Sequence, residues 1–256
     1  MYQILAYIKF LFSSTNQHGV HSPFIFNFVT KCLYDKTKHD EYSKLIDYRT
    51  ALLRNNVSIE ITDFGSGSRV FKSNTRTTRD IAKKSGTPLK RAKLLYRLVT
   101  YFKPKHTLEL GTSLGIATHA MALGNSVNEI TSIEGCPNTS LYAKQQLSNF
   151  KAEHVTVETG EFNIVLSQLK EKNYDLIFFD GHHSKEATIQ YFETLLPKTH
   201  NQTIFIFDDI YWSKGMTEAW EYIKNHNSVT VTADCFYLGF VFFRKEQLKE
   251  HFKIRV

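Results

Sequence analysis

An apolar segment followed by a glycine-rich turn constrains the fold of this chain more than any other part of its sequence. Residues Thr107–Thr118 read TLELGTSLGIAT and contain Gly111 and Gly115. The pattern predicts a β-strand, a turn whose backbone can approach a ligand closely, and the start of a helix, where unpaired N–H groups attract a carboxylate or a phosphate. Glu134 ends the next apolar segment, where an acid can accept hydrogen bonds from ribose hydroxyls. These residues predict a site for a nucleoside cofactor.

Strands and helices alternate along the rest of the chain. Residues 174–180 and 203–209 are largely apolar before their terminal acids, which is typical of strands in the middle of a parallel sheet. Residues 229–233 and 237–244 are separated by so few residues that they must pair as an antiparallel hairpin. A two-lobed dinucleotide-binding enzyme would need a second nucleotide-binding half, for which the chain has no room. We therefore expect one α/β core with a terminal hairpin.

The glycine spacing resembles motif I of a known family. The sequence Glu109-x-Gly111-x-x-x-Gly115, with the order of strands and helices that follows it, resembles the class I S-adenosylmethionine (SAM) methyltransferases over residues 105–245. The resemblance implies a Rossmann-like α/β fold with a seven-stranded sheet, a C-terminal antiparallel hairpin and an N-terminal helical extension. It places a helical extension and basic lid in residues 1–104 and the SAM-dependent methyltransferase core in residues 105–256.

The same resemblance implies SAM as the cofactor and assigns its contacts. Gly111 and Gly115 would shape the loop at the methionine end, and Glu109 would order that loop. Glu134 would hold the ribose, and Glu161 would lie near the adenine. The implied cofactor-binding residues are Glu109, Gly111, Thr112, Ser113, Gly115, Glu134, Glu161 and Asp180.

Acids follow two of the predicted central strands. Asp180 ends one strand, and Asp208 and Asp209 end the other. Three carboxylates at one edge of a sheet would repel one another unless a cation lay between them. The pattern resembles the metal-dependent O-methyltransferases similar to macrocin and catechol O-methyltransferases, and it implies Mg²⁺ bound by Asp180, Asp208 and Asp209. The alternative is that these acids cap helices or hold a substrate without a metal.

A histidine lies beside the first of these acids. His182 stands where the enzymes similar to macrocin O-methyltransferase have an acidic general base. An unperturbed pKa of about 6.5 makes histidine an able proton acceptor near neutrality. We therefore expect His182 and Asp180 to be catalytic, with the neighbouring His183 as the alternative base.

Positive charge is concentrated before the predicted core. The net charge is +7, but residues 69–105 contain twelve Lys or Arg and a single acid, Asp80, so this segment carries +11 and the other residues −4. The segment is either the cationic rim of a lid that attracts an anionic acceptor or RNA, or the solvated face of two helices, over residues 78–85 and 90–102.

Other parts of the sequence indicate the setting of the protein. Three scattered cysteines favour a reducing cytoplasm over a disulfide framework. Residues 1–12 are apolar but too short to span a membrane, and we expect an amphipathic helix packed on the core. Residues 61–69 imitate a second glycine motif and are expected to form a loop, while residues 18–24 (HGVHSPF) predict a turn capped by Ser22. An aromatic content of 14% leaves room for a homodimer surface.

Together these patterns predict a SAM-dependent enzyme. The expected reaction transfers the methyl group to a hydroxyl oxygen of a small-molecule or sugar acceptor, for which an anionic compound would suit, with Mg²⁺ positioning the oxygen. One alternative is an RNA (ribose) methyltransferase that uses the basic residues 69–105. A second alternative is a non-catalytic SAM-binding protein.

Overall fold

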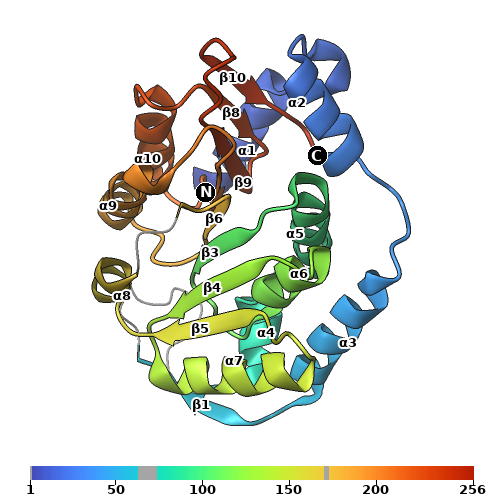
Figure 1. The fold of residues 1–256 in the computed structure, drawn as a ribbon, viewed down its shortest axis with the longest axis vertical. Coiled ribbons are helices and arrows are strands. Elements are labelled where there is room, and N and C mark those ends of the chain that lie inside the picture. The colour runs from blue at the N-terminus through green and yellow to red at the C-terminus, as the bar shows by residue number, and fades with distance from the viewer. Residues whose placement is uncertain (1, 63–73, 170–172) are drawn as a thin grey trace. The chain divides into compact units, whose positions relative to one another are not determined.

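The computed structural model describes residues 2–62, 74–169 and 173–256 (Figure 1). The chain divides into two compact units, one formed by Met1–Tyr34 with Lys170–Val256 and the other by Asp35–Leu169. Residues 63–69 of the imitation glycine motif, and with them Arg69 and Lys72 of the basic segment, lie outside the described residues.

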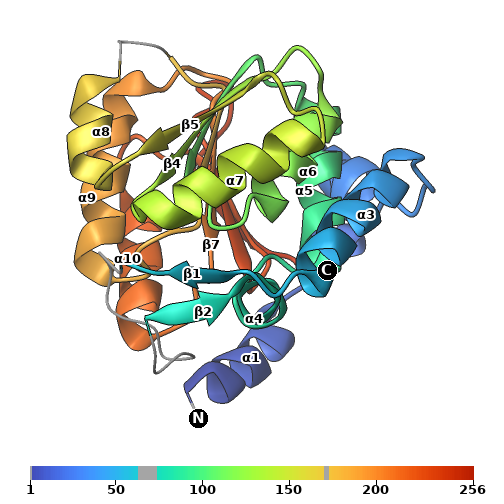
Figure 2. The ribbon, with the colours of Figure 1, turned by 90° about the horizontal axis from the view of Figure 1, so that it is seen from below.

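The unit of residues 35–169 contains three parallel strands in the order β3-β4-β5. Their bounds are β3 (His106–Leu110), β4 (Glu129–Glu134) and β5 (Val155–Thr159). Leu110 pairs with Ile133, and Glu134 pairs with Thr159. The connecting helices are α6 (Ile116–Gly124) and α7 (Pro137–Asn149), and α8 (Phe162–Gln168) follows β5. Figure 2 shows α7 running beside β4 and β5. The glycine turn and Glu134 thus leave neighbouring strands at the same edge.

Helices precede these strands in the same unit. They are α3 (Glu41–Arg54), α4 (Thr78–Lys84) and α5 (Leu89–Phe102), and a small antiparallel pair is formed by β1 (Ser58–Glu60) and β2 (Thr75–Thr77). The two helices predicted in the basic segment are confirmed as α4 and α5. Leu95 and Leu98 on the apolar side of α5 are buried, whereas Lys90 is exposed, as expected for a helix with one face toward a core.

The other unit contains five strands in the order β10-β8-β9-β7-β6. They are β6 (Leu176–Phe179), β7 (Ile204–Asp208), β8 (Val231–Asp234), β9 (Leu238–Phe242) and β10 (Glu250–Lys253). β6 and β7 are parallel, with Phe179 opposite Phe207. β9 is antiparallel to both β7 and β8, so the predicted hairpin is confirmed.

Helices and a further strand complete this unit. The helices are α1 (Tyr2–Ser13), α2 (Pro23–Phe28), α9 (Lys185–Leu195) and α10 (Lys214–Asn225), with the short turns η1 (Gln17–Gly19), η2 (Val29–Leu33) and η3 (Leu196–Lys198). β10 pairs parallel to β8, and the sequence analysis does not predict it. With β10 included, strands β3 to β10 number eight among the described residues, one more than the predicted seven.

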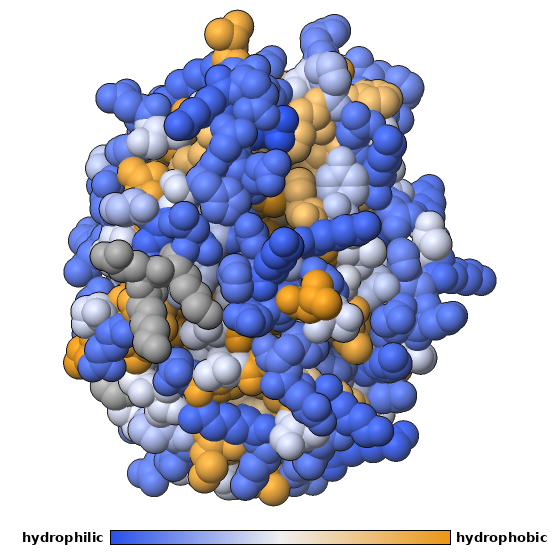
Figure 3. Space-filling model, viewed as in Figure 1, coloured by the Kyte–Doolittle hydropathy of each residue, from blue (hydrophilic) through white to orange (hydrophobic). Residues whose placement is uncertain are grey.

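Aromatic side chains fill the core of this second unit. Phe205, Phe207, Phe240 and Phe242 on β7 and β9 are at most 1% exposed, as expected for strands that are apolar on both faces. Gly239 on β9 leaves room for Trp220 of α10, because a Cβ at Gly239 would lie 2.7 Å from the indole ring. On the face of the molecule drawn in Figure 3, hydrophilic residues predominate and hydrophobic residues lie in separate groups.

The N-terminal residues form a helix that differs from its expected packing. α1 is helical as predicted, but Phe10 is its one buried side chain. None of the helices in the described ranges combines the length and the apolar character that crossing a bilayer requires. Ser22 caps α2 as predicted, since its Oγ accepts a hydrogen bond from the Ile25 N–H at 3.4 Å.

The alternation of strands and helices, the parallel central strands and the terminal hairpin are therefore confirmed, and with them the α/β fold class. The boundary at residue 104 separates predicted functions, a lid from a core, and it stays a prediction.

Candidate functional site

The glycine turn after β3 has an unusual backbone. Three of its five residues, Gly111, Ser113 and Gly115, have φ angles of 106°, 48° and 75°. Residues with side chains rarely adopt such angles, and two of these positions are glycines. The N–H groups of Gly111 and Thr112 both donate to the Ile133 carbonyl, at 2.9 and 3.2 Å. The turn is thereby folded back onto the end of β4.

Gly115 begins α6 at a point where no side chain fits. A Cβ there would lie 2.6 Å from the Tyr48 hydroxyl. Tyr48 comes from α3, is 1% exposed, and donates a hydrogen bond to the Leu114 carbonyl at 2.8 Å. Its ring also stacks on His119 of α6, with ring centroids 4.3 Å apart. Helix α3 therefore supports the turn through Tyr48.

Glu134 is tied to the same turn. Its Oε2 accepts a hydrogen bond from the Ser113 N–H at 2.8 Å, and its Oε1 accepts one from the Cys136 N–H at 3.0 Å. Burial raises the pKa of Glu134, and these two donors oppose the rise. A carboxylate has about four acceptor positions, so Glu134 can still accept hydrogen bonds from two ligand hydroxyls.

Glu109 lies beneath the turn and is fully buried. Its Oε2 accepts hydrogen bonds from Thr118 of α6 and Ser132 of β4, each at 2.5 Å. Ser132 in turn shares a 2.5 Å hydrogen bond with Thr112. Within the described residues, Oε1 of Glu109 has no hydrogen-bond partner. Glu109 thus connects the turn, α6 and β4 through hydroxyl groups.

The predicted cofactor-binding residues of the turn and the strand ends differ in their exposure to solvent. Gly111, Ser113 and Glu134 are partly exposed, whereas Thr112 and Gly115 are buried. Glu161 is exposed at the N-cap of α8, two residues after β5. Of the predicted cofactor-binding residues in this unit, those open to a ligand are Gly111, Ser113, Glu134 and Glu161, while Glu109, Thr112 and Gly115 support the turn.

The three predicted metal ligands follow two neighbouring strands, β6 and β7, of the other unit. Because Phe179 is opposite Phe207, continuing the parallel register by one residue sets Asp180 opposite Asp208. Asp208 is 3% exposed, and its Oδ1 accepts a hydrogen bond from the Asp209 N–H at 2.9 Å. Asp209 has a φ of 52°, and its N–H also donates to the Tyr237 carbonyl at 2.7 Å. The hairpin thereby fixes the turn after β7.

The side-chain chemistry of Asp180, Asp208 and Asp209 suits a metal ion better than their observed arrangement does. Their carboxylate oxygens are the ligands that Mg²⁺ prefers, and Mg²⁺ is often held by one or two carboxylates and several waters. In the part of the chain that the structure describes, no group of three or more His, Cys, Asp or Glu side chains is arranged to hold a metal ion. The neighbouring strand ends of Asp180 and Asp208 therefore offer a pair of carboxylates and not a closed cage.

The two candidate bases have different partners. His182 has a φ of 55°, and its Nδ1 lies 3.1 Å from the hydroxyl of Tyr191 on α9. The Nε2 of His183 lies 3.9 Å from Asp180 Oδ1. Tyr191 holds the His182 ring through one nitrogen, which leaves Nε2 on the other side of the ring. The structure thus joins Asp180 to His183, and it joins His182 to a residue that the sequence analysis did not select.

Several supporting residues have no local sequence signal. Tyr48 contacts a carbonyl 66 positions along the chain, and Tyr191 lies nine residues after His182 on a separate helix. Ser132 and Thr118 are ordinary small polar residues until Glu109 is known to be buried between them.

Replacing Gly115 with alanine tests the turn. The added methyl group meets the Tyr48 hydroxyl and requires a left-handed backbone, so we expect Gly115→Ala to lower the free energy of unfolding by about 1–3 kcal/mol. We expect it to weaken binding of the SAM analogue S-adenosylhomocysteine (SAH) by about tenfold or more, measured by calorimetry. The double variant Gly115→Ala/Tyr48→Phe should recover part of the stability.

The matched control is Gly215→Ala in α10, where a Cβ meets its nearest neighbour at 3.4 Å. Alanine is favoured over glycine within a helix, so this variant should be as stable as the original protein or more so. Equal SAH binding by the Gly115 and Gly215 variants would contradict the role of the turn.

Glu109 gives the protein a specific pH dependence. Burial raises the pKa of Glu109 from 4.5 to about 7. The folded state then binds more protons than the unfolded chain between these values, so the free energy of unfolding falls as the pH rises from about 4.5 to about 7. We expect this group to contribute a fall of about 3 kcal/mol. Urea unfolding of the original protein and of Glu109→Gln at several pH values tests this. The free energy of unfolding of the original protein should fall relative to that of the variant by about this amount as the pH rises across the range, and parallel curves would contradict it.

Comparisons with known proteins bear on the fold that carries these residues. Residues 108–210 match a family model described as a methyltransferase domain, and these residues run from β3 to the turn after β7. No match was found among curated proteins.

Solved structures of low sequence identity share the fold. A putative O-methyltransferase from Klebsiella pneumoniae is 17% identical with a TM-score of 0.58, and the match covers 86% of this chain and 96% of that one. The SAH-bound methyltransferase PaMTH1 from Podospora anserina is 14% identical with a TM-score of 0.61, covering 88% and 97%. An O-methyltransferase from Bacillus cereus in complex with SAH is 20% identical with a TM-score of 0.54, covering 83% and 93%.

The matched strands, turn and helices are those that carry Glu109, Glu134, Asp180 and Asp208. Residues 108–210 thus match a model of a methyltransferase domain, and the α/β fold of the chain is like that of these solved methyltransferases.

Proposed function

We propose that the protein transfers the methyl group of SAM to a hydroxyl oxygen of a small or glycan-type acceptor, with the assistance of Mg²⁺. The observation that supports the proposal is the parallel register of β6 and β7, in which Phe179 lies opposite Phe207, because Asp180 and Asp208 are the residues that come next on each chain segment. The carboxylate oxygens of this pair are the groups that would hold a cation beside an acceptor hydroxyl.

The groups proposed to bind SAM are partly backbone groups and partly side chains. SAM, when bound, supplies an electrophilic methyl group on a sulfonium centre. The exposed backbone at Gly111 and Ser113 would bind its methionine end, and the remaining acceptor positions of Glu134 would hold the ribose hydroxyls. Glu161 would accept a hydrogen bond from the adenine amino group, and Asp180 would also face the cofactor.

Asp180, Asp208 and Asp209 are the proposed magnesium ligands. Their support is the choice of oxygen donors and the neighbouring strand ends, and Mg²⁺ in turn would favour the ionised form of an acceptor hydroxyl. Asp208 is nearly fully buried and already accepts the Asp209 N–H, so its orientation is fixed before any ligand arrives. A fixed carboxylate loses little freedom on binding a cation.

His182 is the proposed general base. The acceptor oxygen attacks the methyl carbon, the carbon–sulfur bond breaks with its electron pair on sulfur, and the hydroxyl proton moves to histidine. The His182 Nδ1 and the Tyr191 hydroxyl are 3.1 Å apart, and in the tautomer in which Nδ1–H donates to that oxygen, the Nε2 of His182 carries the lone pair that would accept this proton. His183 is the alternative base, with Asp180 as its partner.

The basic segment supports a second candidate function. Lys90 on α5 and Lys83 on α4 are exposed, which suits an anionic acceptor or the phosphates of RNA. Other cations of these helices are engaged within the protein: Lys84 pairs with Asp80 at 3.5 Å, and Lys93 lies over the Tyr42 ring at 4.7 Å. This partial engagement favours an anionic small molecule over a long RNA contact.

Magnesium titration of the SAH-saturated protein tests the proposal. At saturating SAH, we expect a single saturable site in the original protein and loss of that site in Asp180→Asn, because the variant loses a charged ligand. Methyl transfer from labelled SAM to a panel of sugars and diols should fall by about a hundredfold or more in this variant.

Asp175→Asn is the matched control, because Asp175 directly precedes β6 whereas Asp180 directly follows it, and Asp175 pairs with His200 at 3.0 Å. Magnesium binding that is absent up to millimolar concentrations, or that is equal in the two variants, would contradict the metal site. Transfer to RNA ribose alone would favour the second candidate, and SAH binding without transfer to any acceptor would favour a non-catalytic protein.

Separate histidine variants test the base. We expect His182→Ala to lower kcat by about 100-fold or more with unchanged SAH affinity, and Tyr191→Phe to shift the pH dependence of kcat, because it removes the partner that fixes the ring. His183→Ala serves as the comparison, since it is the adjacent residue of the same type. A larger loss in His183→Ala than in His182→Ala would transfer the role to His183.

A further inference from the structure

Helix α1 carries an apolar stripe on its outer side. Ile4, Ile8 and Phe12 are spaced by four residues and therefore lie on one face of the helix. Their exposed fractions are 67%, 46% and 89%, and Leu5 beside them is 55% exposed. The opposite side packs on the protein, with the Phe10 ring 5.5 Å from that of Phe236. A helix that is apolar on both sides is normally covered on both.

Lys9 lies within α1, and Lys253 lies at its last residue. Residues 1–34 contain Lys9 and Lys31 but no Asp or Glu. Lys253 Nζ lies 3.4 Å from Ser13 Oγ, at the last residue of α1. The acid opposite Lys253 in the register of β8 and β10 is Asp234, which is buried and accepts hydrogen bonds from Tyr211 and the Phe236 N–H. The surface at this end of α1 is therefore positive.

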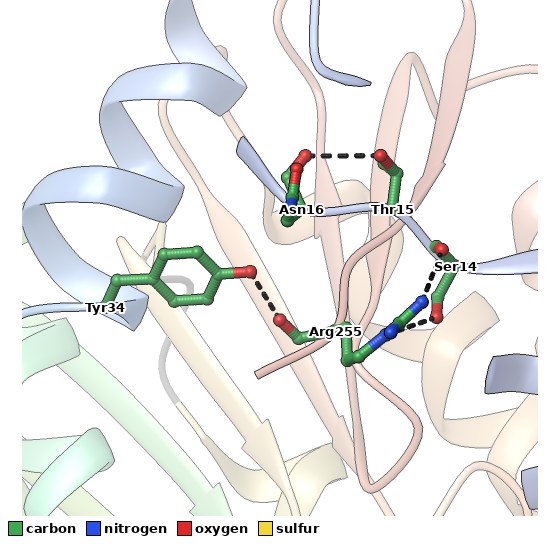
Figure 4. A pocket seen from close by; sticks show the side chains of 5 residues that line it. All are labelled: Ser14, Thr15, Asn16, Tyr34 and Arg255. Atoms are coloured by element: carbon green, nitrogen blue, oxygen red, sulfur yellow. Dashed lines mark hydrogen bonds between the residues drawn. The ribbon is translucent and has the colours of Figure 1, made fainter. Parts of the chain in front are cut away.

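A polar cavity of about 280 Å³ follows the last turn of α1. Its lining consists of Ser14, Thr15, Asn16, Tyr34 and Arg255, and Figure 4 shows these side chains around it. Arg255 is the one charged residue of the lining, and three hydroxyl groups and an amide accompany it. The three hydroxyls donate to main-chain carbonyls, so Arg255 is the group of this lining that would attract an anion.

The guanidinium group of Arg255 is held in place. Its Nη2 donates to the Leu11 and Ser14 carbonyls, at 3.1 and 3.2 Å, and its Nε donates to Ser14 Oγ at 3.4 Å. The Tyr34 hydroxyl donates to the Arg255 carbonyl. The side chain is thus fixed at the end of α1, and among the described residues Nη1 takes part in none of these bonds.

We propose that α1 docks the protein on an anionic lipid surface. The stripe of Ile4, Ile8 and Phe12 would enter the boundary between headgroups and acyl chains, while the cavity with Arg255 would receive a headgroup phosphate. Interfacial helices combine an apolar face with cations in this way. A second copy of the chain is a poorer occupant, because one face of a helix about 18 Å long falls far short of the ~800 Å² that each partner buries in a stable interface.

Vesicle sedimentation of the full chain tests this proposal. We expect binding to vesicles of phosphatidylglycerol and phosphatidylcholine in equal parts, weaker binding to phosphatidylcholine alone, and loss with rising salt. Ile8→Asn should weaken binding about tenfold. If Ile8→Asn folds poorly, Phe12→Ser tests the same face of the helix and should have the same effect. Arg255→Gln should remove most of the preference for the anionic lipid.

Ile164→Asn is the matched control, because Ile164 on α8 is also exposed, at 54%, and it should bind vesicles like the original protein. Calorimetry with inorganic phosphate separates a headgroup site from a site for free phosphate: phosphate binding without vesicle binding overturns the proposal. A dimer in analytical ultracentrifugation that Ile8→Asn dissociates, without vesicle binding, overturns it as well.

Discussion

Parallel strand pairing in register is the constraint on which the candidate site residues of each unit depend. Leu110 opposite Ile133 brings the glycine turn and Glu134 to one edge of their strands, and Phe179 opposite Phe207 does the same for Asp180 and Asp208. A slip of one residue would turn every side chain of a strand to its other face. The apolar residues of β6 and β7 prevent such a slip through bulk and shape, so core packing sets the position of the acids.

Glu109 shows how a buried charge can serve a binding loop. A carboxylate without water is costly to bury, and the rise in the pKa of Glu109 to about 7 reflects this cost. The hydroxyls of Thr118 and Ser132 offset part of it. In return, one residue joins a strand, a helix and the turn between them. Its sequence position suggests a ligand contact, but its burial makes it a supporting residue.

Local patterns and distant contacts account for different parts of the molecule. Glycine spacing and apolar runs predict the turn at Gly111, the strand ends at Asp180 and Asp208, and the hairpin, because these depend on short-range periodicity. The support of Leu114 by Tyr48, the hold of Tyr191 on His182 and the pairing of β10 depend on tertiary contacts, for which one sequence offers no signal. The sequence predicts that α1 packs on the core, and Phe10 does so. It does not predict that Ile4, Ile8 and Phe12 stay exposed, because an apolar pattern does not tell which residues of a helix are covered.

Backbone conformation supports the same site residues without reference to sequence motifs. Six non-glycine residues among those described have positive φ. Lys103, Lys151 and Phe236 lie at helix ends or in the hairpin turn, where such angles are ordinary. The others are Ser113, His182 and Asp209, with φ of 48°, 55° and 52°. Asp209 directly follows β7, and Ser113 and His182 lie in the turns that follow β3 and β6. Each costs about 1–2 kcal/mol relative to a right-handed conformation. Strain that persists beside the carboxyl ends of a parallel sheet is a mark of binding or catalysis, so the backbone singles out three residues that the motifs had also selected.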